Sequence, residues 1–175
     1  MRVIAGDHKG RRLRTPAGRD TRPTADRVRE ALFSILGPLD GERVLDLYAG
    51  SGALGIEALS RGAAAAVFVD SDARAVSAIR HNLDAIRVDA PVHKRDALAY
   101  LRDASERPFD LVFLDPPYSS ALELAGPLSE RLPAVLSKDA RIVSESDKRN
   151  PLTLTLPLMD ERTYGDTRIA IHSAA

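Results

Sequence analysis

Residues 44–55 read VLDLYAGSGALG and combine two patterns that rarely adjoin by chance. An apolar run from Val44 to Leu47 is typical of a buried strand. The glycines that follow allow a tight turn and a close approach of the backbone to a ligand. An apolar-periodic segment then continues to Gly62 and predicts a helix. A strand, a glycine turn and a helix form the first unit of an open α/β sheet, whose ligands bind at the carboxyl ends of its strands.

The same alternation continues through the rest of the chain. Further strands are predicted at residues 65–70, 92–94, 109–114, 140–144, 152–156 and 167–172, the last two as a hairpin around residues 164–166. Helices are predicted from an Asp72 N-cap through Leu83, at 97–101 and at 121–132. This order predicts an α/β fold: a Rossmann-like, mostly parallel seven-stranded sheet with helices on both faces.

The N-terminal 36 residues differ from this pattern and predict a short extension. Residues 3–6 and 12–14 could pair as a hairpin, and a helix is expected from a Thr24 N-cap to Leu36. Residues 1–29 carry nine Arg or Lys and three Asp, a net charge of +6, so residues 30–175 sum to −6. A basic arm favours a phosphate-rich partner over a merely solubilising tail. The candidate nucleic-acid contacts are Arg11, Arg12, Arg14, Arg22, Arg27 and Arg29.

Length and composition limit the other possibilities. A chain of 175 residues fits one domain, here an extension at 1–36 and an α/β core at 37–175. It has no cysteine, which excludes disulfides and thiol catalysis, and its four histidines are scattered, so no metal site is expected. No apolar run is long enough to span a bilayer and the start does not resemble a signal peptide, so we expect a cytoplasmic monomer with no membrane partner.

The glycine turn predicts a nucleotide-like cofactor. Gly50, Gly52 and Gly55 fit the dinucleotide pattern G-x-G-x-x-G, with Asp70 placed to bind a ribose. Asp46 argues against a dinucleotide, because a carboxylate just before the turn would repel a pyrophosphate and attract an ammonium group. S-adenosylmethionine has that ammonium group and no phosphate, so it is the favoured cofactor.

Three further side chains each allow either a cofactor-binding or a structural interpretation. Asp96 follows the third predicted strand and could bind the adenine amino group, or simply cap the helix at Ala97. Tyr48 and Ser51 are expected to line the cofactor pocket, with packing or capping as the alternative for either residue.

A second motif, Asp115-Pro116-Pro117-Tyr118, follows the strand at 109–114. Two prolines make a stiff, extended turn that presents a carboxylate, backbone carbonyls and an aromatic ring. The motif resembles that of class I methyltransferases that modify exocyclic amines: adenine N6, cytosine N4 or guanine N2. Asp115 and the Pro116 carbonyl would accept hydrogen bonds from the amine, and Tyr118 would stack on the base. A purely structural turn is the alternative.

The N-terminal residues narrow the resemblance to one family of methyltransferases. Residues 22–33, together with 44–62, 2–6 and 164–167, closely resemble the bacterial family that methylates N2 of a guanine in 16S rRNA of the small ribosomal subunit. The resemblance implies that residues 1–35 help to form the RNA site, within an assembled or assembling subunit. This sequence departs from that family at Asp70, a position at which Glu is frequent in such enzymes. A DNA or RNA methyltransferase acting on adenine or cytosine, and a non-catalytic ribosome-assembly factor, remain the alternatives.

Overall fold

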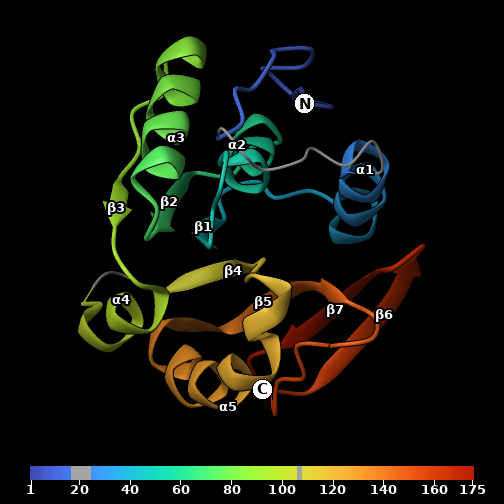
Figure 1. Ribbon diagram of the computed structural model, residues 1–175. Coiled ribbons are helices and arrows are strands. Elements are labelled where there is room, and N and C mark those ends of the chain that lie inside the picture. Colours follow the sequence, from blue (N-terminus) through green and yellow to red (C-terminus); the bar gives the residue numbers. More distant parts are fainter. Residues whose placement is uncertain (17–24, 106–107) are drawn as a thin grey trace.

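A computed structural model describes residues 1–16, 25–105 and 108–175, with Ala25 and Tyr118 described by their backbone alone. Seven strands form one sheet in the order β3-β2-β1-β4-β5-β7-β6 (Figure 1). The strands are β1 Arg43–Leu47, β2 Ala65–Asp70, β3 Val92–Lys94, β4 Phe109–Leu114, β5 Leu136–Asp147, β6 Leu158–Tyr164 and β7 Thr167–Ser173. The helices are α1 Ala25–Leu36, α2 Ala53–Ser60, α3 Ala73–Ile86, α4 Ala97–Asp103 and α5 Ala121–Arg131, with short 3-10 turns η1 Tyr118–Ser120 and η2 Leu132–Val135.

The direction of the strands places the functional edge of the sheet. β3, β2, β1, β4 and β5 run parallel, whereas β7 is antiparallel to β5 and β6 is antiparallel to β7. The chain moves outward from β1 to β2 and β3, and then returns to β4 on the other side of β1. The carboxyl ends of β1 and β4 therefore lie at the point where the strand order reverses, which is where open α/β sheets bind ligands.

Two apolar cores cover the two faces of the sheet. Helices α1, α2 and α3 pack on one face, where Phe33, Phe68 and Phe113 are fully buried. Helices α4 and α5 pack on the other, over Leu45, Leu47 and other strand residues. Figure 1 shows this division, with α1 to α3 on one side of the sheet and α4 and α5 on the other. The prediction of helices on both faces is thus confirmed.

Local sequence signals account for most element boundaries. The strands predicted at 65–70, 92–94 and 109–114 have those bounds. The Asp72 carboxylate caps α3 by accepting the backbone N–H of Arg74 at 2.8 Å, as predicted. The predicted Thr24 cap lies outside the described residues. β5 extends well beyond the predicted 140–144, because its second half is paired by β7.

The prediction of a strand at 152–156 is wrong. Leu152 and Leu154 are buried in the core under α4 and α5, but their segment has no strand structure. The partner of β7 is instead β6, and the two strands meet at the predicted turn around Gly165, whose φ is +64°. The alternating leucines therefore reflect burial of one side of an irregular segment, not pairing in a sheet.

The N-terminal hairpin forms, but with little regular structure. A single antiparallel bridge joins Arg2 and Arg12. Three backbone hydrogen bonds support it: Val3 N–H to the Arg11 carbonyl, Gly10 N–H to the Val3 carbonyl, and Leu13 N–H to the Met1 carbonyl. The buried side chains of Val3 and Leu13 attach the hairpin to the core on the α1–α3 face.

Candidate functional site

The glycine turn joins the end of β1 to α2, and its conformation explains the glycines. Gly50 and Gly52 have φ of +59° and +76°, in the left-handed region that other residues rarely adopt. Gly55 has a different reason: a Cβ there would lie 2.4 Å from the ring of Phe68 and 3.1 Å from Asp46 Oδ2. The turn therefore lets α2 pack directly on β2, beside the carboxyl end of β1.

Asp46 is a buried carboxylate at this junction. Only 2% of it is exposed, and its Oδ2 accepts the backbone N–H of Gly55 at 2.9 Å. Burial raises its pKa well above the ordinary value; the Gly55 hydrogen bond opposes this, and the charges of Asp115 and Asp70 add to it. Within the described residues, no Lys or Arg pairs with it. A buried carboxylate without a cationic partner fits the ammonium group of S-adenosylmethionine better than it fits a phosphate.

Asp70 fixes the turn from the end of β2. Its Oδ2 accepts the N–H of Gly50 and its Oδ1 accepts the N–H of Asp72, both at 2.9 Å. A carboxylate has about four lone-pair positions, so two of them stay available for ribose hydroxyls. The structure thus gives Asp70 a role in holding the glycine turn, in addition to the predicted ribose contact.

Tyr48 and Asp96 share one side of the site. Tyr48 adopts φ +60°, a strained conformation for a tyrosine, at the point where the chain leaves β1. Its hydroxyl is buried without a hydrogen-bond partner. Burial, followed by the nearby charge of Asp96, raises the pKa of Tyr48 to about 12. Asp96 also caps α4 by accepting the N–H of Ala99 at 2.9 Å. A buried polar atom beside a carboxylate fits a polar ligand such as a purine and ribose.

Ser51 joins the glycine turn to the N-terminal segment and to α3. Its hydroxyl donates to Met1 Sδ at 3.5 Å. Its carbonyl accepts from Nδ2 of Asn82, a buried residue of α3. The same amide bonds the backbone of Arg14 twice, accepting its N–H at 2.7 Å and donating to its carbonyl at 2.9 Å. Asn82 therefore connects the glycine turn to the N-terminal arm, a link that the sequence analysis missed.

The Pro-Pro turn lies at the carboxyl end of β4. Leu114 pairs with Leu47 of β1 and Ser144 of β5, so Asp115 leaves the sheet between those two strands. Asp115 is half-buried, Pro116 is buried and Pro117 is exposed. Pro117 has the extended backbone that was predicted, with φ −54° and ψ 134°. Tyr118 begins η1. Its side chain, for which stacking on the base was predicted, lies outside the described part of the structure.

The N-terminal arm is held on α2 by Glu57, which is fully buried. Its carboxylate accepts the backbone N–H groups of Ile4 at 2.8 Å and Ala5 at 3.0 Å. It also pairs with Arg61 at 2.8 Å and lies 3.8 Å from Nε of Arg29. Figure 1 shows the arm beside α2. A charged residue on the buried side of a predicted helix is the signal that could have identified Glu57.

The candidate RNA contacts divide into three groups. Arg11, Arg12, Arg14 and Arg27 are exposed, as a phosphate contact requires. Arg22 lies outside the described residues. The prediction for Arg29 is corrected: only 4% of it is exposed, and its guanidinium donates to the Arg2 carbonyl and to Asp26. Arg29 therefore holds the arm and is too buried to bind a phosphate.

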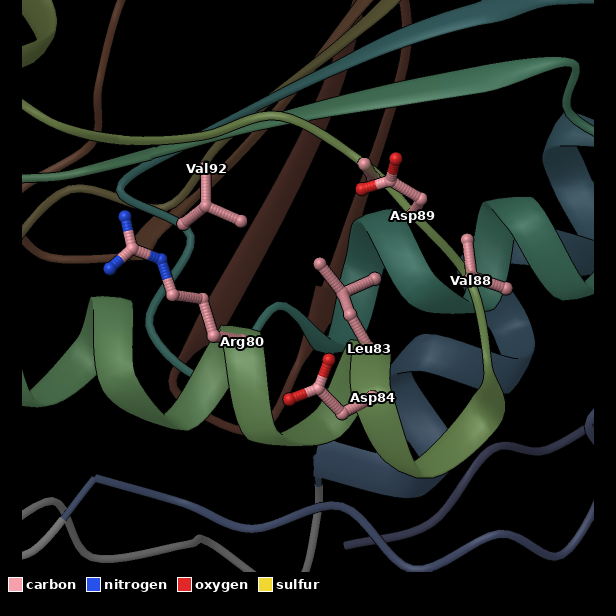
Figure 2. A pocket seen from close by; sticks show the side chains of 7 residues that line it. Arg80, Leu83, Asp84, Val88, Asp89 and Val92 are labelled. Atoms are coloured by element: carbon pink, nitrogen blue, oxygen red, sulfur yellow. The ribbon is translucent and has the colours of Figure 1, made fainter.

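One cavity of about 270 Å³ lies away from this edge. Arg80 and Asp84 of α3 face Asp89 and Val92 across it (Figure 2). Val92 begins β3, so the cavity lies at the amino end of that strand, and none of the predicted site residues lines it. Across residues 1–16, 25–105 and 108–175, no three metal-binding side chains gather and no helix could cross a membrane.

Comparisons with known proteins agree with this geometry. Residues 1–173 match the family described as "Conserved hypothetical protein 95". The chain is 43% identical to "Putative rRNA methyltransferase YlbH" of Bacillus subtilis, over 98% of both chains. It is 38% identical to "Ribosomal RNA small subunit methyltransferase D" of Escherichia coli K12, over 87% of this chain and 77% of the other. Among solved structures, "Putative methyltransferase yhhF" from Escherichia coli superposes with a TM-score of 0.83 at 34% identity, covering 99% and 97% of the two chains.

Proposed function

Because this chain belongs to the Conserved hypothetical protein 95 family and resembles ribosomal RNA methyltransferases over most of its length, we propose that it methylates the exocyclic N2 amine of a guanine in 16S rRNA of the small ribosomal subunit. The methyl donor is S-adenosylmethionine.

The observation that carries the proposal is the closeness of Asp46 and Asp115. Asp46 lies opposite Phe113, two residues before Asp115, so both carboxylates lie at the carboxyl ends of adjacent strands at the switch point. Burial raises the pKa of Asp46, and the nearby charge of Asp115 adds to that rise. Asp46 would hold a cationic donor, and Asp115 would hold an amine on the other side of the transferred methyl group. This arrangement supports methyl transfer to an amino nitrogen better than hydride transfer.

Each residue of the site has a definite task in that reaction. Asp46 would bind the ammonium group of the cofactor, Asp70 the ribose and Asp96 the adenine. The cofactor supplies an electrophilic methyl group on a sulfonium. Asp115 and the carbonyl of Pro116 would accept the two N–H groups of the base amine. These bonds would free its lone pair and stabilise the positive charge that grows on nitrogen as the N–C bond forms and the methyl C–S bond breaks, which would leave S-adenosylhomocysteine.

Alignment supplies much of the remaining rate, because both reactants are fixed on the ends of rigid strands. No strong base is needed, since the alkylated nitrogen readily releases a proton to water through the Asp115 carboxylate. Tyr118 is proposed to stack on the base, which contributes roughly 1–3 kcal/mol.

The RNA would bind along the arm. We assign phosphate contacts to Arg11, Arg12, Arg14 and Arg27, which are exposed, and keep Arg22 as a proposed contact. Residues 1–36 would act as an extension of the methyltransferase core at 37–175 within a single domain. The hydrogen bonds of Glu57 and Asn82 hold this extension next to the cofactor site.

The test is incorporation of labelled methyl groups into small subunits isolated from cells that lack this activity, followed by nucleoside analysis. The wild-type protein should form N2-methylguanine. Asp115→Ala should lower turnover by about 100- to 1000-fold, the effect of losing one transition-state hydrogen-bond partner, while S-adenosylhomocysteine still binds. Asp139→Ala is a matched control, because Asp139 is exposed in the first half of β5, far from the carboxyl edge.

The alternatives give different results. N6-methyladenine or N4-methylcytosine as the product would show that the amine was assigned to the wrong base. Binding to small subunits without any methyl transfer would favour a non-catalytic assembly factor. Unchanged turnover in Asp115→Ala would refute the role given to the Pro-Pro turn.

A further inference from the structure

The register of the sheet places a second carboxylate beside Asp115. Asp46 of β1 is opposite Phe113 of β4, and Phe113 is opposite Val143 of β5. Side chains alternate along a strand, so residues two positions further on point to the same face. Asp115 follows Phe113 by two positions and Glu145 follows Val143 by two. Glu145, still within β5, therefore lies on the face that also holds Asp46. Asp115 leaves β4 next to it, and its charge acts on Asp46 from there.

The neighbours of Glu145 confirm its orientation. Ser144 and Ser146, on either side of it, are fully buried. Glu145 itself is half-buried, and it lies opposite Ile169 of β7. Opposite residues in an antiparallel pair share a face, and Ile169 belongs to the core under α1, α2 and α3. Glu145 thus faces the side of the sheet on which the N-terminal extension packs.

The spacing of β4 and β5 suits a single base between Asp115 and Glu145. Adjacent strands lie about 4.8 Å apart, and β4 stops at Leu114 while β5 continues to Asp147. Beyond Leu114, Glu145 borders the space that the Pro-Pro turn leaves open. Asp115 and Glu145 both interact with other groups in the structure, but each carboxylate has lone pairs for more than one donor.

Two neighbouring acceptors match one nucleobase better than the others. Guanine presents its N1–H next to the N2 amine, so both positions donate. Adenine N1 and cytosine N3, which lie beside the exocyclic amines of those bases, are acceptors. A carboxylate beside the amine would bind guanine and repel adenine and cytosine.

On this basis we propose that Glu145 is a specificity-determining residue that accepts the N1–H of the target guanine while Asp115 holds its N2 amine. The inference rests on the proposed function, and it explains why an Asp-Pro-Pro-Tyr turn, which suits all three amines, would select guanine. A residue that only braces the sheet would have no such effect on the choice of base.

The experiment uses small subunits reconstituted on 16S rRNA that carries either guanine or 2-aminopurine at the modified position. 2-Aminopurine keeps the amine at C2, but its N1 accepts a hydrogen bond. The wild-type protein should prefer guanine in kcat/KM by about 10- to 100-fold, the effect of one hydrogen bond to a charged group. In Glu145→Gln the amide can donate a hydrogen bond to N1 of 2-aminopurine. The ratio of kcat/KM for guanine to that for 2-aminopurine should therefore fall to within about threefold of unity, which is less than the effect of one hydrogen bond to a charged group.

Two further variants separate specificity from stability. Glu161→Gln removes an exposed carboxylate of β6 that pairs with Arg168, and it should keep the wild-type preference. Glu145→Asp keeps the charge but shortens the reach, so it should lower activity on guanine while still rejecting 2-aminopurine. Thermal melting and S-adenosylhomocysteine binding check that each variant is folded.

The outcomes distinguish the inference from the proposed function. If wild-type protein forms N2-methylguanine and Glu145→Gln lowers activity on both bases equally, or leaves the preference unchanged, the role of Glu145 is refuted and the proposed function stands. If wild-type protein forms no N2-methylguanine, the proposed function fails and this inference fails with it.

Discussion

Removing the buried charge of Glu57 should loosen the N-terminal arm from the core. The carboxylate accepts two backbone N–H groups of the arm at 2.8 and 3.0 Å and pairs with Arg61 at 2.8 Å. It also lies 3.8 Å from the guanidinium of Arg29, which is almost fully buried. Two substitutions probe it: Glu57→Gln keeps the shape and one carbonyl oxygen, whereas Glu57→Ala removes every acceptor.

The size of the effect follows from these contacts. Breaking a buried ion pair by removing one partner costs about 3–5 kcal/mol, since the remaining charge stays buried. We expect Glu57→Ala to lower the free energy of unfolding by that amount. Glu57→Gln also leaves Arg29 and Arg61 without their anion, but it keeps one acceptor for the arm, so its effect should lie at the lower end of this range, about 3 kcal/mol.

Urea unfolding followed by circular dichroism measures the stability, and limited proteolysis measures release of the arm. Glu123→Gln is the control, because Glu123 is exposed on α5. In methylation assays at a temperature where all variants are folded, KM for small subunits should rise while S-adenosylhomocysteine affinity changes little. If Glu57→Ala unfolds within about 1 kcal/mol of wild type, well short of the cost of a broken buried pair, the argument from buried charge is refuted.

Two further predictions concern the cofactor site. Gly55→Ala places a Cβ 2.4 Å from the buried Phe68 ring, so urea unfolding should show that the free energy of unfolding falls by about 1–3 kcal/mol from overpacking. Gly126→Ala in α5 is the control, because a Cβ there meets nothing within 4 Å, and it should raise the free energy of unfolding by up to about 1 kcal/mol. Equal effects of the two substitutions would contradict the packing argument. Asp46 has a raised pKa in the folded protein, so the native state keeps a proton that the unfolded chain has lost. Stability therefore falls as pH rises above about 4, through the raised pKa. Asp46→Asn should be more stable than wild type at pH 7 but not at pH 4, and should bind S-adenosylmethionine more weakly by calorimetry; a variant less stable at both pH values would contradict this reasoning.

Local patterns in the sequence were sufficient wherever a contact lies close along the chain. Apolar runs identified β2 and β4 within their observed bounds. The Asp72 cap and the positive φ of Gly50 and Gly52 depend on neighbouring residues alone. Edge strand β6 was missed because its side chains are mostly exposed and include Asp160, Glu161 and Arg162, and charged edges protect a sheet from further pairing at the expense of an apolar signal.

What the sequence by itself determined was the alternation of strands and helices, the glycine turn and the Asp-Pro-Pro-Tyr motif at the end of a strand. Only the tertiary structure decided that Arg29 holds the arm instead of facing solvent, since its partner Glu57 is 28 residues away. Likewise, Glu145 is 30 residues from Asp115 and becomes its neighbour only when β4 pairs with β5. Burial of charge and register between strands depend on which segments meet, and no local pattern of residue types contains that information.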